Sequence, residues 1–367
     1  MTRLHQLYDD HGQSPWIDNL SRPLLRTGRL AELVEQGIRG VTSNPTIFAK
    51  AILAGSDYDE QFADLLRSRA AVDDAYWDMV VADIVDAMAV LAPVYAAAGG
   101  ADGYVSLEVA PALAHDTDGT VAAARDLDDR IEGPNLFVKV PATTAGVGAV
   151  HRLVADGRSI NVTLIFGLTR YGEVIEAYLS GLEARSGDLS GIASVASFFI
   201  SRVDTEVDRR LEAIGSEAAL ALRGRAAVAQ AKLAYALFAE RFAGERWEAL
   251  VARGAHCQRP LWASTSTKNP AYPDLLYVDS LIGPDTVNTM PDATVAAFVD
   301  HGVLARTVDA DVDDARRTMD ALAGVGVDVD DVAEVLEREG VASFEKSFDE
   351  LISALSQKAG ELHPTGA

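Results

Sequence analysis

The sequence contains a single cysteine, Cys257, among its 367 residues. A lone thiol excludes an intramolecular disulfide and a metal centre built from several cysteines, and it is typical of a reducing compartment. The seven histidines show no pair at HxH or HxxxH spacing, and neither a P-loop nor a GxSxG motif occurs. We therefore expect no bound metal, and a reaction that depends on neither a P-loop nor a GxSxG nucleophile.

Positive charge is also scarce, with 32 Lys and Arg against 55 Asp and Glu and a net charge of −23. Nucleic acids and anionic membranes need a basic surface, so we expect neither as a partner. An anionic small substrate would need a few Lys and Arg to converge locally. The N-terminus lacks the apolar segment of a signal peptide, and the most apolar long stretch, residues 79–98, carries Asp83 and Asp86. We expect a cytoplasmic protein.

Short apolar runs rich in β-branched and aromatic residues alternate with longer Ala- and Leu-rich stretches of helical period. We expect strands at residues 15–19, 38–44, 103–109, 135–141, 159–166, 193–201, 259–265 and 285–290. We expect helices at roughly 23–36, 57–97, 118–131, 145–155, 169–183, 203–250, 272–280 and beyond 291. Strands that alternate with helices indicate a parallel sheet, and eight such units are the number in a closed (β/α)8 TIM barrel. An open doubly wound sheet usually carries a glycine fingerprint, and the nearest candidate, at 145–151, lacks the third glycine. The expected fold class is therefore α/β, a (β/α)8 TIM barrel.

Two segments exceed a minimal barrel. Residues 203–256 predict a helical insertion, because apolar residues from Ala231 to Phe242 recur at helical spacing on one face. Residues 311–358 predict an acidic C-terminal helical extension. No linker marks a domain boundary, so we expect residues 1–367 to form one barrel domain with these two additions.

Polar residues occupy one face of the expected strands. Period-two alternation places Glu108, Lys139, Asn161 and Thr163 on the faces opposite to their apolar neighbours, pointing into the barrel. Further polar or functional candidates lie near strand ends: Asp18, Asn44, Ser197 and Phe199. Barrel active sites lie at the carboxyl ends of the strands, so these residues predict a site at one mouth.

Each candidate also has a structural interpretation. Glu108 could be only the ion-pair partner of Lys139, and Asn44, followed by proline, could be a helix N-cap. Asp18 could cap the turn before Ser21, and Asn161 and Thr163 could be interior hydrogen-bonding groups.

Lys139 is the residue whose burial demands a function, since lysine is almost never buried without a partner. A lysine attacks carbonyl groups when its amine is neutral, and lowering its pKa by about 3 units needs roughly 4 kcal/mol of bias against the charged form. Phe137, Val138 and Val140 would supply desolvation. An ionised Glu108 nearby would oppose it, so we expect a water or Thr163 to separate Glu108 from Lys139. Asp18 and Glu108 fit the acid and base that cleavage through an imine requires.

Six sequence blocks resemble the signature blocks of transaldolases and occur in that family's order. They are WIDNLSR (16–22), TSNPTIF (42–48), LFVKVPAT (136–143), INVTLIF (160–166), SFFISR (197–202) and WASTSTKNP (262–270). The resemblance is nearest to the longer bacterial subgroup. It implies transfer of a dihydroxyacetone unit from a ketose phosphate, such as sedoheptulose 7-phosphate or fructose 6-phosphate, to an aldose phosphate, in the pentose phosphate pathway and without a cofactor.

The resemblance also implies roles for individual residues. Lys139 matches the imine lysine, Asp18 and Glu108 the acid and base, and Asn44 a substrate-binding asparagine. The pair that holds water and the imine region matches Asn161 and Thr163. The block that shapes the site and binds phosphate matches Ser197, Phe199 and Arg202. A second phosphate contact, often arginine in relatives, matches Lys268. Arg202 could instead form a salt bridge to Asp204 or Glu206, and Lys268 could be a solvated loop lysine.

The sequence leaves three alternatives to transaldolase. A fructose 6-phosphate aldolase would release dihydroxyacetone instead of transferring it, but relatives of that kind carry tyrosine where Glu108 stands. A pyridoxal phosphate enzyme or a non-catalytic scaffold barrel are the other two. An ionised Glu108, held so by hydrogen bonds, is a poor proton donor, so we expect the three-carbon unit to stay bound until an acceptor arrives. Nothing in the sequence distinguishes a monomer from a homodimer.

Overall fold

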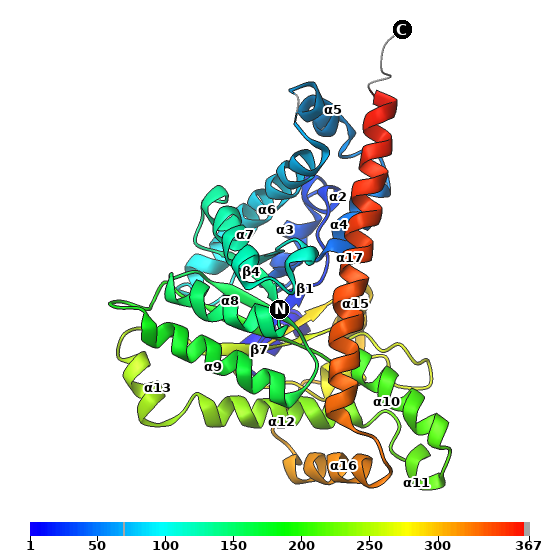
Figure 1. Ribbon diagram of the computed structural model, residues 1–367. Helices are drawn as coiled ribbons and strands as arrows, with labels where there is room; N and C mark the ends of the chain where they lie inside the picture. The colour runs from blue at the N-terminus through cyan, green and yellow to red at the C-terminus, as the bar shows by residue number, and fades with distance from the viewer. Residues whose placement is uncertain (69, 363–367) are drawn as a thin grey trace.

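All eight expected strands form in the computed structural model, which describes residues 1–68 and 70–362 (Figure 1). Over these residues, parallel strands pair in chain order and β8 pairs with β1, so that the sheet closes into a barrel. The strands are β1 (Gln13–Ile17), β2 (Val41–Thr42), β3 (Val105–Glu108), β4 (Leu136–Pro141), β5 (Ile160–Ile165), β6 (Ser194–Phe199), β7 (Gln258–Ala263) and β8 (Thr286–Met290). The structure confirms the (β/α)8 barrel.

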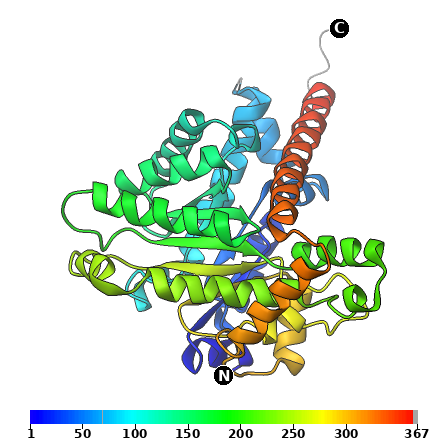
Figure 2. The same ribbon diagram turned by 60° about the horizontal axis from the view of Figure 1, so that its bottom comes forward.

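Helices follow the strands and surround the sheet (Figure 2). Up to β5 they are α1 (Arg3–Asp9), α2 (Arg22–Arg26), α3 (Arg29–Glu35), α4 (Pro45–Leu53), α5 (Asp59–Arg67), α6 (Val72–Ala97), the short η1 (Pro111–Leu113), α7 (Thr117–Arg130) and α8 (Thr144–Ala155). After β5 they are α9 (Leu168–Ala184), α10 (Ser201–Ile214), α11 (Glu217–Leu220), α12 (Ala226–Arg241), α13 (Gly244–Val251), α14 (Leu276–Asp279), α15 (Asp292–His301), α16 (Val312–Gly324) and α17 (Val329–Leu362).

Several boundaries differ from the sequence prediction. The expected helix at 272–280 is only the four-residue α14, because Pro270 and Pro273 interrupt the preceding segment. Helix α1 was not expected, and α4 was expected only through the interpretation of Asn44 as a helix N-cap, which the structure confirms. The second strand is shorter than residues 38–44: at Gly40 the backbone lies against the Trp16 indole, and a Cβ there would meet that ring at 2.3 Å.

The segments at 203–256 and 311–358 contain helices. Helices α10 to α13 lie between β6 and β7, and the expected apolar face of α12 is buried at Ala231, Ala234, Tyr235 and Phe238. Helices α16 and α17 follow the last barrel helix. Figure 1 shows α17 as a long helix that runs beside α10 and α4 and reaches α5.

Helix α6 covers the apolar stretch at 79–98. Among the described residues it is the one helix whose length and composition would allow it to cross a membrane. Tyr76, Met79, Ile84 and Leu91 are nevertheless buried against the rest of the protein. This pattern is that of a core helix packed on a barrel.

The register of the strands arranges the interior in layers. Glu108 on β3 lies beside Lys139 on β4, and Lys139 lies beside Asn161 on β5. Neighbouring strands are about 4.8 Å apart, so these three side chains form one layer near the carboxyl ends of the strands, here called the carboxyl-end mouth. Two residues earlier on β4, Phe137 stacks on Tyr104 at 4.0 Å near the opposite, amino-end mouth.

Candidate active site

Lys139 is buried at the carboxyl-end mouth, with 4% of its surface exposed. Its Nζ lies 3.2 Å from Oε2 of Glu108 and donates a hydrogen bond to the carbonyl oxygen of Ser43 at 3.1 Å. The expectation that a water or Thr163 separates Lys139 from Glu108 is therefore wrong. The register of β3 and β4 sets the two residues side by side, and no spacer fits between them.

The carboxyl groups of Asp18 and Glu108 both interact electrostatically with Lys139. Asp18 directly follows β1 and accepts a hydrogen bond from Oγ1 of Thr42 at 2.8 Å. Burial raises the pKa of Asp18, and Lys139 and Thr42 offset part of that rise. Burial likewise raises the pKa of Glu108, against the opposing effect of Lys139. The expectation that hydrogen bonds hold Glu108 ionised is wrong in its balance, because burial outweighs the contact with Lys139 and the pKa of Glu108 rises. Both acids therefore titrate at a higher pH than an exposed carboxyl group.

The β5 residues occupy different depths. Thr163 lines the cavity above Lys139, and its Oγ1 is buried without a hydrogen-bond partner among the described residues. Asn161 is fully buried: its amide nitrogen donates to Oγ of Ser106 at 3.0 Å, and its amide oxygen accepts from Oγ of Ser197 at 2.7 Å. Asn161 and Ser197 thus form an interior hydrogen-bond chain, which agrees with the structural interpretation of Asn161.

A cavity of about 100 Å³ joins most of the expected residues. Its lining is Asp18, Thr42, Asn44, Lys139, Thr163, Ser197, Phe199, Arg202, Ala263, Ser264, Thr289 and Phe344. Of the expected set, Glu108 and Asn161 lie behind this lining, and Lys268 lies outside it. Asn44 has two roles, because its Oδ1 caps α4 by accepting from the Ile47 amide at 2.9 Å while the residue also faces the cavity.

Cations gather at the rim of this cavity. Arg202, in the first turn of α10, is half-buried 5.5 Å from the ring of Phe199, and burial lowers its pKa. The suggested salt bridges of Arg202 do not form, since Asp204 bonds to Ala227 and Tyr277 and Glu206 pairs with Arg209 and Arg210. Lys268 is a surface residue whose amine donates a hydrogen bond to Ser266. Partial desolvation of that amine and the charge of the nearby Arg202 lower the pKa of Lys268. Neighbouring like charges of this kind would be stabilised by an anion.

Five cavity residues were not predicted: Thr42, Ala263, Ser264, Thr289 and Phe344. Oγ1 of Thr42 contacts Oγ1 of Thr289 at 2.6 Å and so links β2 to β8 beneath Asp18. Thr42 lies inside the TSNPTIF block, but nothing in its type marked it. Phe344 belongs to α17, 74 residues after the last sequence block, which ends at residue 270. Its only signal was an apolar stripe at helical spacing, which predicts a packed face but not what it packs against.

A family model described as "Transaldolase/Fructose-6-phosphate aldolase" matches residues 15–355. The chain belongs to this family. The protein named "Transaldolase" from Frankia alni is 52% identical over 354 residues, which are 95% of this chain and 95% of that one. The "Transaldolase" of Thermobifida fusca is 52% identical over 358 residues, 96% and 97% of the two chains. "Transaldolase 1" of Streptomyces coelicolor is 51% identical over 353 residues, 95% and 93% of the two.

Membership of the transaldolase family agrees with the geometry of the site. The similarity extends over the barrel and most of α17, so it includes every residue that lines the cavity. A buried lysine between two carboxyl groups, facing a small polar cavity with cations at its rim, suits covalent chemistry on an anionic carbonyl compound.

Proposed function

We propose that this chain is a transaldolase that moves a dihydroxyacetone unit between sugar phosphates through an imine on Lys139. The observation that carries the proposal is the convergence of Lys139, Asp18 and Glu108 at one buried mouth of the barrel. The 52% identity to named transaldolases over nearly the whole chain supports it.

The reaction begins with the proton of Lys139. Glu108 lies 3.2 Å from Nζ and has a pKa raised by burial, so it can accept this proton and leave the amine neutral. The amine adds to the C2 carbonyl of a ketose phosphate, and water leaves as the imine forms. Glu108 and the hydroxyl of Thr163 flank the place where that water departs and later returns.

Cleavage then uses the protonated imine as an electron sink. Asp18, in its ionised form, takes the proton of the C4 hydroxyl while the C3–C4 bond breaks, and an aldose phosphate leaves. The electron pair of that bond stays on the three-carbon unit as an enamine. The enamine carbon attacks the aldehyde of an acceptor such as glyceraldehyde 3-phosphate or erythrose 4-phosphate, Asp18 returns its proton, and hydrolysis of the imine frees the new ketose phosphate.

The remaining residues bind and position. Arg202 and Lys268 bind the substrate phosphate at the rim, where burial and their mutual repulsion outweigh the attraction of Glu339 and Asp18. The amide oxygen of Asn44 serves as the helix cap, and its amide nitrogen, which makes no hydrogen bond to the described residues, donates to a substrate hydroxyl. Phe199 shapes the wall below Arg202, and the Asn161–Ser197 chain holds β5 and β6 in place under the imine.

The proposal also covers the domain organisation, compartment and partners of the protein. Residues 1–367 act as one barrel domain, in the cytoplasm, as a monomer or homodimer, and bind neither nucleic acid nor membrane. The net charge of −23 supports the last two statements. Covalent catalysis through Lys139 requires no cofactor.

Trapping of the imine tests the proposal. Borohydride reduction in the presence of fructose 6-phosphate should add a three-carbon unit to Lys139, located by peptide mass mapping. Lys268→Met is the matched control, because this lysine lies at the rim of the same mouth and should not change the position of the adduct. An adduct on another lysine, or none with the full-length wild-type protein, would contradict the mechanism.

A further inference from the structure

Helix α17 covers the carboxyl-end mouth of the barrel. Along its length it contacts α10, the end of β5, η1, α4 and α6. Oγ1 of Thr46 donates to Oγ of Ser347 at 2.9 Å, and the Phe348 ring packs edge-on to Tyr76 at 5.3 Å. These contacts come from the end of β5 and from segments that follow β2, β3 and β6, so α17 lies across the opening and not beside it.

Helix α17 packs against β5 at a local distortion of that strand. Leu164 has φ of 60°, a left-handed conformation that is unfavourable for leucine, at a point where the β5–β6 register shifts. The Leu164 side chain reaches α17 at Gly340, where a Cβ would lie 3.0 Å from Leu164 Cδ2 and 3.6 Å from Nη1 of Arg202. A glycine inside a long helix is disfavoured on its own. Here it allows α17 to approach the mouth closely.

One turn after Gly340, Phe344 projects into the cavity. It is 4% exposed, its ring centroid lies 5.9 Å from Nζ of Lys139, and it faces Asp18 and Thr163 across the same cavity. The cavity volume of about 100 Å³ is well below the ~300–1,000 Å³ of common small-molecule sites. Phe344 is therefore the part of α17 that a carbon chain attached to Lys139 would contact.

We infer that Phe344 is a specificity-determining residue, whose ring shields the three-carbon enamine from water and so favours transfer over release. This inference rests on the proposed function. The sequence suggested that an ionised Glu108 protects the enamine because it is a poor proton donor. Since burial raises the pKa of Glu108, its charge alone cannot prevent protonation of the enamine. An apolar cover limits the supply of water instead.

The competing step consumes one water molecule. A proton from water adds to the nucleophilic carbon of the enamine, the hydroxide adds to C2 of the resulting imine, and the C2–N bond breaks as Lys139 regains its amine and dihydroxyacetone leaves. Transfer replaces the first of these events by attack on an aldehyde carbon. The partition between the two depends on how often water rather than an aldehyde reaches the enamine.

The test measures dihydroxyacetone released per transfer turnover, from fructose 6-phosphate with erythrose 4-phosphate, in the same sample. Because both products come from the folded enzyme, the ratio does not depend on how much of a variant is folded. Phe344→Ala should raise the ratio by about tenfold or more. Phe344→Leu retains an apolar cover and should stay within about twofold to threefold of wild type.

Phe348→Ala is the matched control. Phe348 lies one turn further along α17, packs on Tyr76 and Trp77, and does not line the cavity. The substitution removes packing against α6 but no side chain from the cavity lining, so the ratio should stay within about twofold of wild type. An unchanged ratio in Phe344→Ala, or an equal rise in Phe348→Ala, would overturn the role of Phe344 while transfer itself stays intact. Failure of the wild-type enzyme to transfer at all would contradict the proposed function instead.

Discussion

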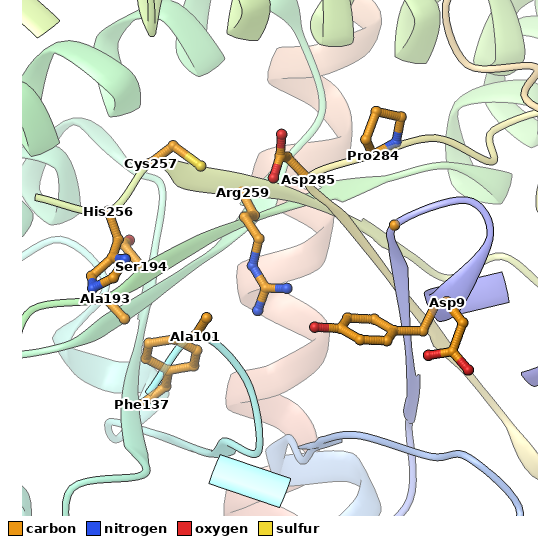
Figure 3. Close-up of a pocket in the computed structure, with 12 residues that line it drawn as sticks. Asp9, Ala101, Phe137, Ala193, Ser194, His256, Cys257, Arg259, Pro284 and Asp285 are labelled. Carbon is orange, nitrogen blue, oxygen red and sulfur yellow. The ribbon is translucent and has the colours of Figure 1, made fainter. Parts of the chain in front are cut away.

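The two mouths of the barrel both hold charged side chains, yet they differ in how those charges are satisfied. At the amino-end mouth a cavity of about 490 Å³ is lined by Arg259 and Asp285 (Figure 3). Tyr8 also belongs to its lining. The charge that faces Arg259 is Asp102, at 3.6 Å. Asp102 is already bound by Arg39 at 2.8 Å, by the Trp16 indole nitrogen at 3.0 Å and by Ser14. This cluster is an internal ion pair with its acceptors occupied.

At the carboxyl-end mouth the hydrogen-bonding capacity is not used up. Among the described residues Oγ1 of Thr163 has no hydrogen-bond partner, and Oε2 of Glu108 faces only Nζ of Lys139, at 3.2 Å. Burial raises the pKa of both Asp18 and Glu108. The cavity there is about a fifth of the volume of the one at the opposite mouth. In this barrel the site is therefore marked by incompletely satisfied polar groups around a nucleophile and not by the size of its cavity.

The largest expected effect is that of Lys139→Met. It removes the nucleophile, and we expect kcat/KM for transfer to fall by at least about a thousandfold. The fold should persist, because Glu108 can take up a proton when its partner is lost, given its raised pKa. Steady-state transfer assays and circular dichroism measure the two effects. Loss of the folded signal would mean that the Lys139–Glu108 pair is primarily structural.

Arg202→Ala should have the next largest effect. Removal of one charge-assisted contact to phosphate, worth about 1.5–3 kcal/mol, should raise KM for fructose 6-phosphate roughly 10- to 100-fold. Turnover with dihydroxyacetone as donor, which has no phosphate, should change little. Arg209→Ala is the control, since Arg209 is exposed on the same helix and pairs with Glu206. Equal losses with both donors would indicate that Arg202 supports the structure of the mouth.

Much of this comparison could be predicted from the sequence. Period-two alternation placed Lys139, Glu108 and Thr163 inside the barrel, and the order of the strands brought their ends to one mouth. The alternation does not specify the offset between neighbouring strands. That offset follows from closure of the whole barrel, and it is why the direct contact of Lys139 with Glu108 was missed.

The cover of the site was beyond sequence reasoning for another reason. The apolar stripe of α17 predicts burial, but its partner depends on the path of the chain after α16. The prediction that Glu108 stays ionised was wrong for a similar reason. The strand and face of Glu108 were predicted, but the mouth in which it is buried is closed by α17, which comes from the other end of the chain.

A smaller effect is expected at Asp18 and appears as a shift in pH dependence. Asp18 must be ionised to take the C4 hydroxyl proton, so kcat should fall as pH drops through its raised pKa. The Thr42 hydroxyl lowers that pKa, and Thr42→Val should therefore move the acid limb to higher pH, by less than about one unit. Thr42→Ser keeps the hydroxyl and should not move it. A shift to lower pH would show that another group controls the acid limb.

The smallest effect should come from Arg259→Met, which repeats the substitution made at Lys139 on the inward face of the opposite mouth. Asp102 would keep Arg39, Trp16, Ser14 and the Gly103 amide, so no charge is left uncompensated. The pair lost is long, at 3.6 Å, and the methionine side chain can fill part of the space that the arginine stem occupied. We expect transfer activity within about twofold of wild type and a change of about 1 kcal/mol or less in the free energy of unfolding by urea. A much larger loss of stability would mean that Arg259, rather than Arg39, neutralises Asp102. A loss of activity without loss of stability would mean that the amino-end mouth takes part in function, and the contrast between the two mouths would then have to be abandoned.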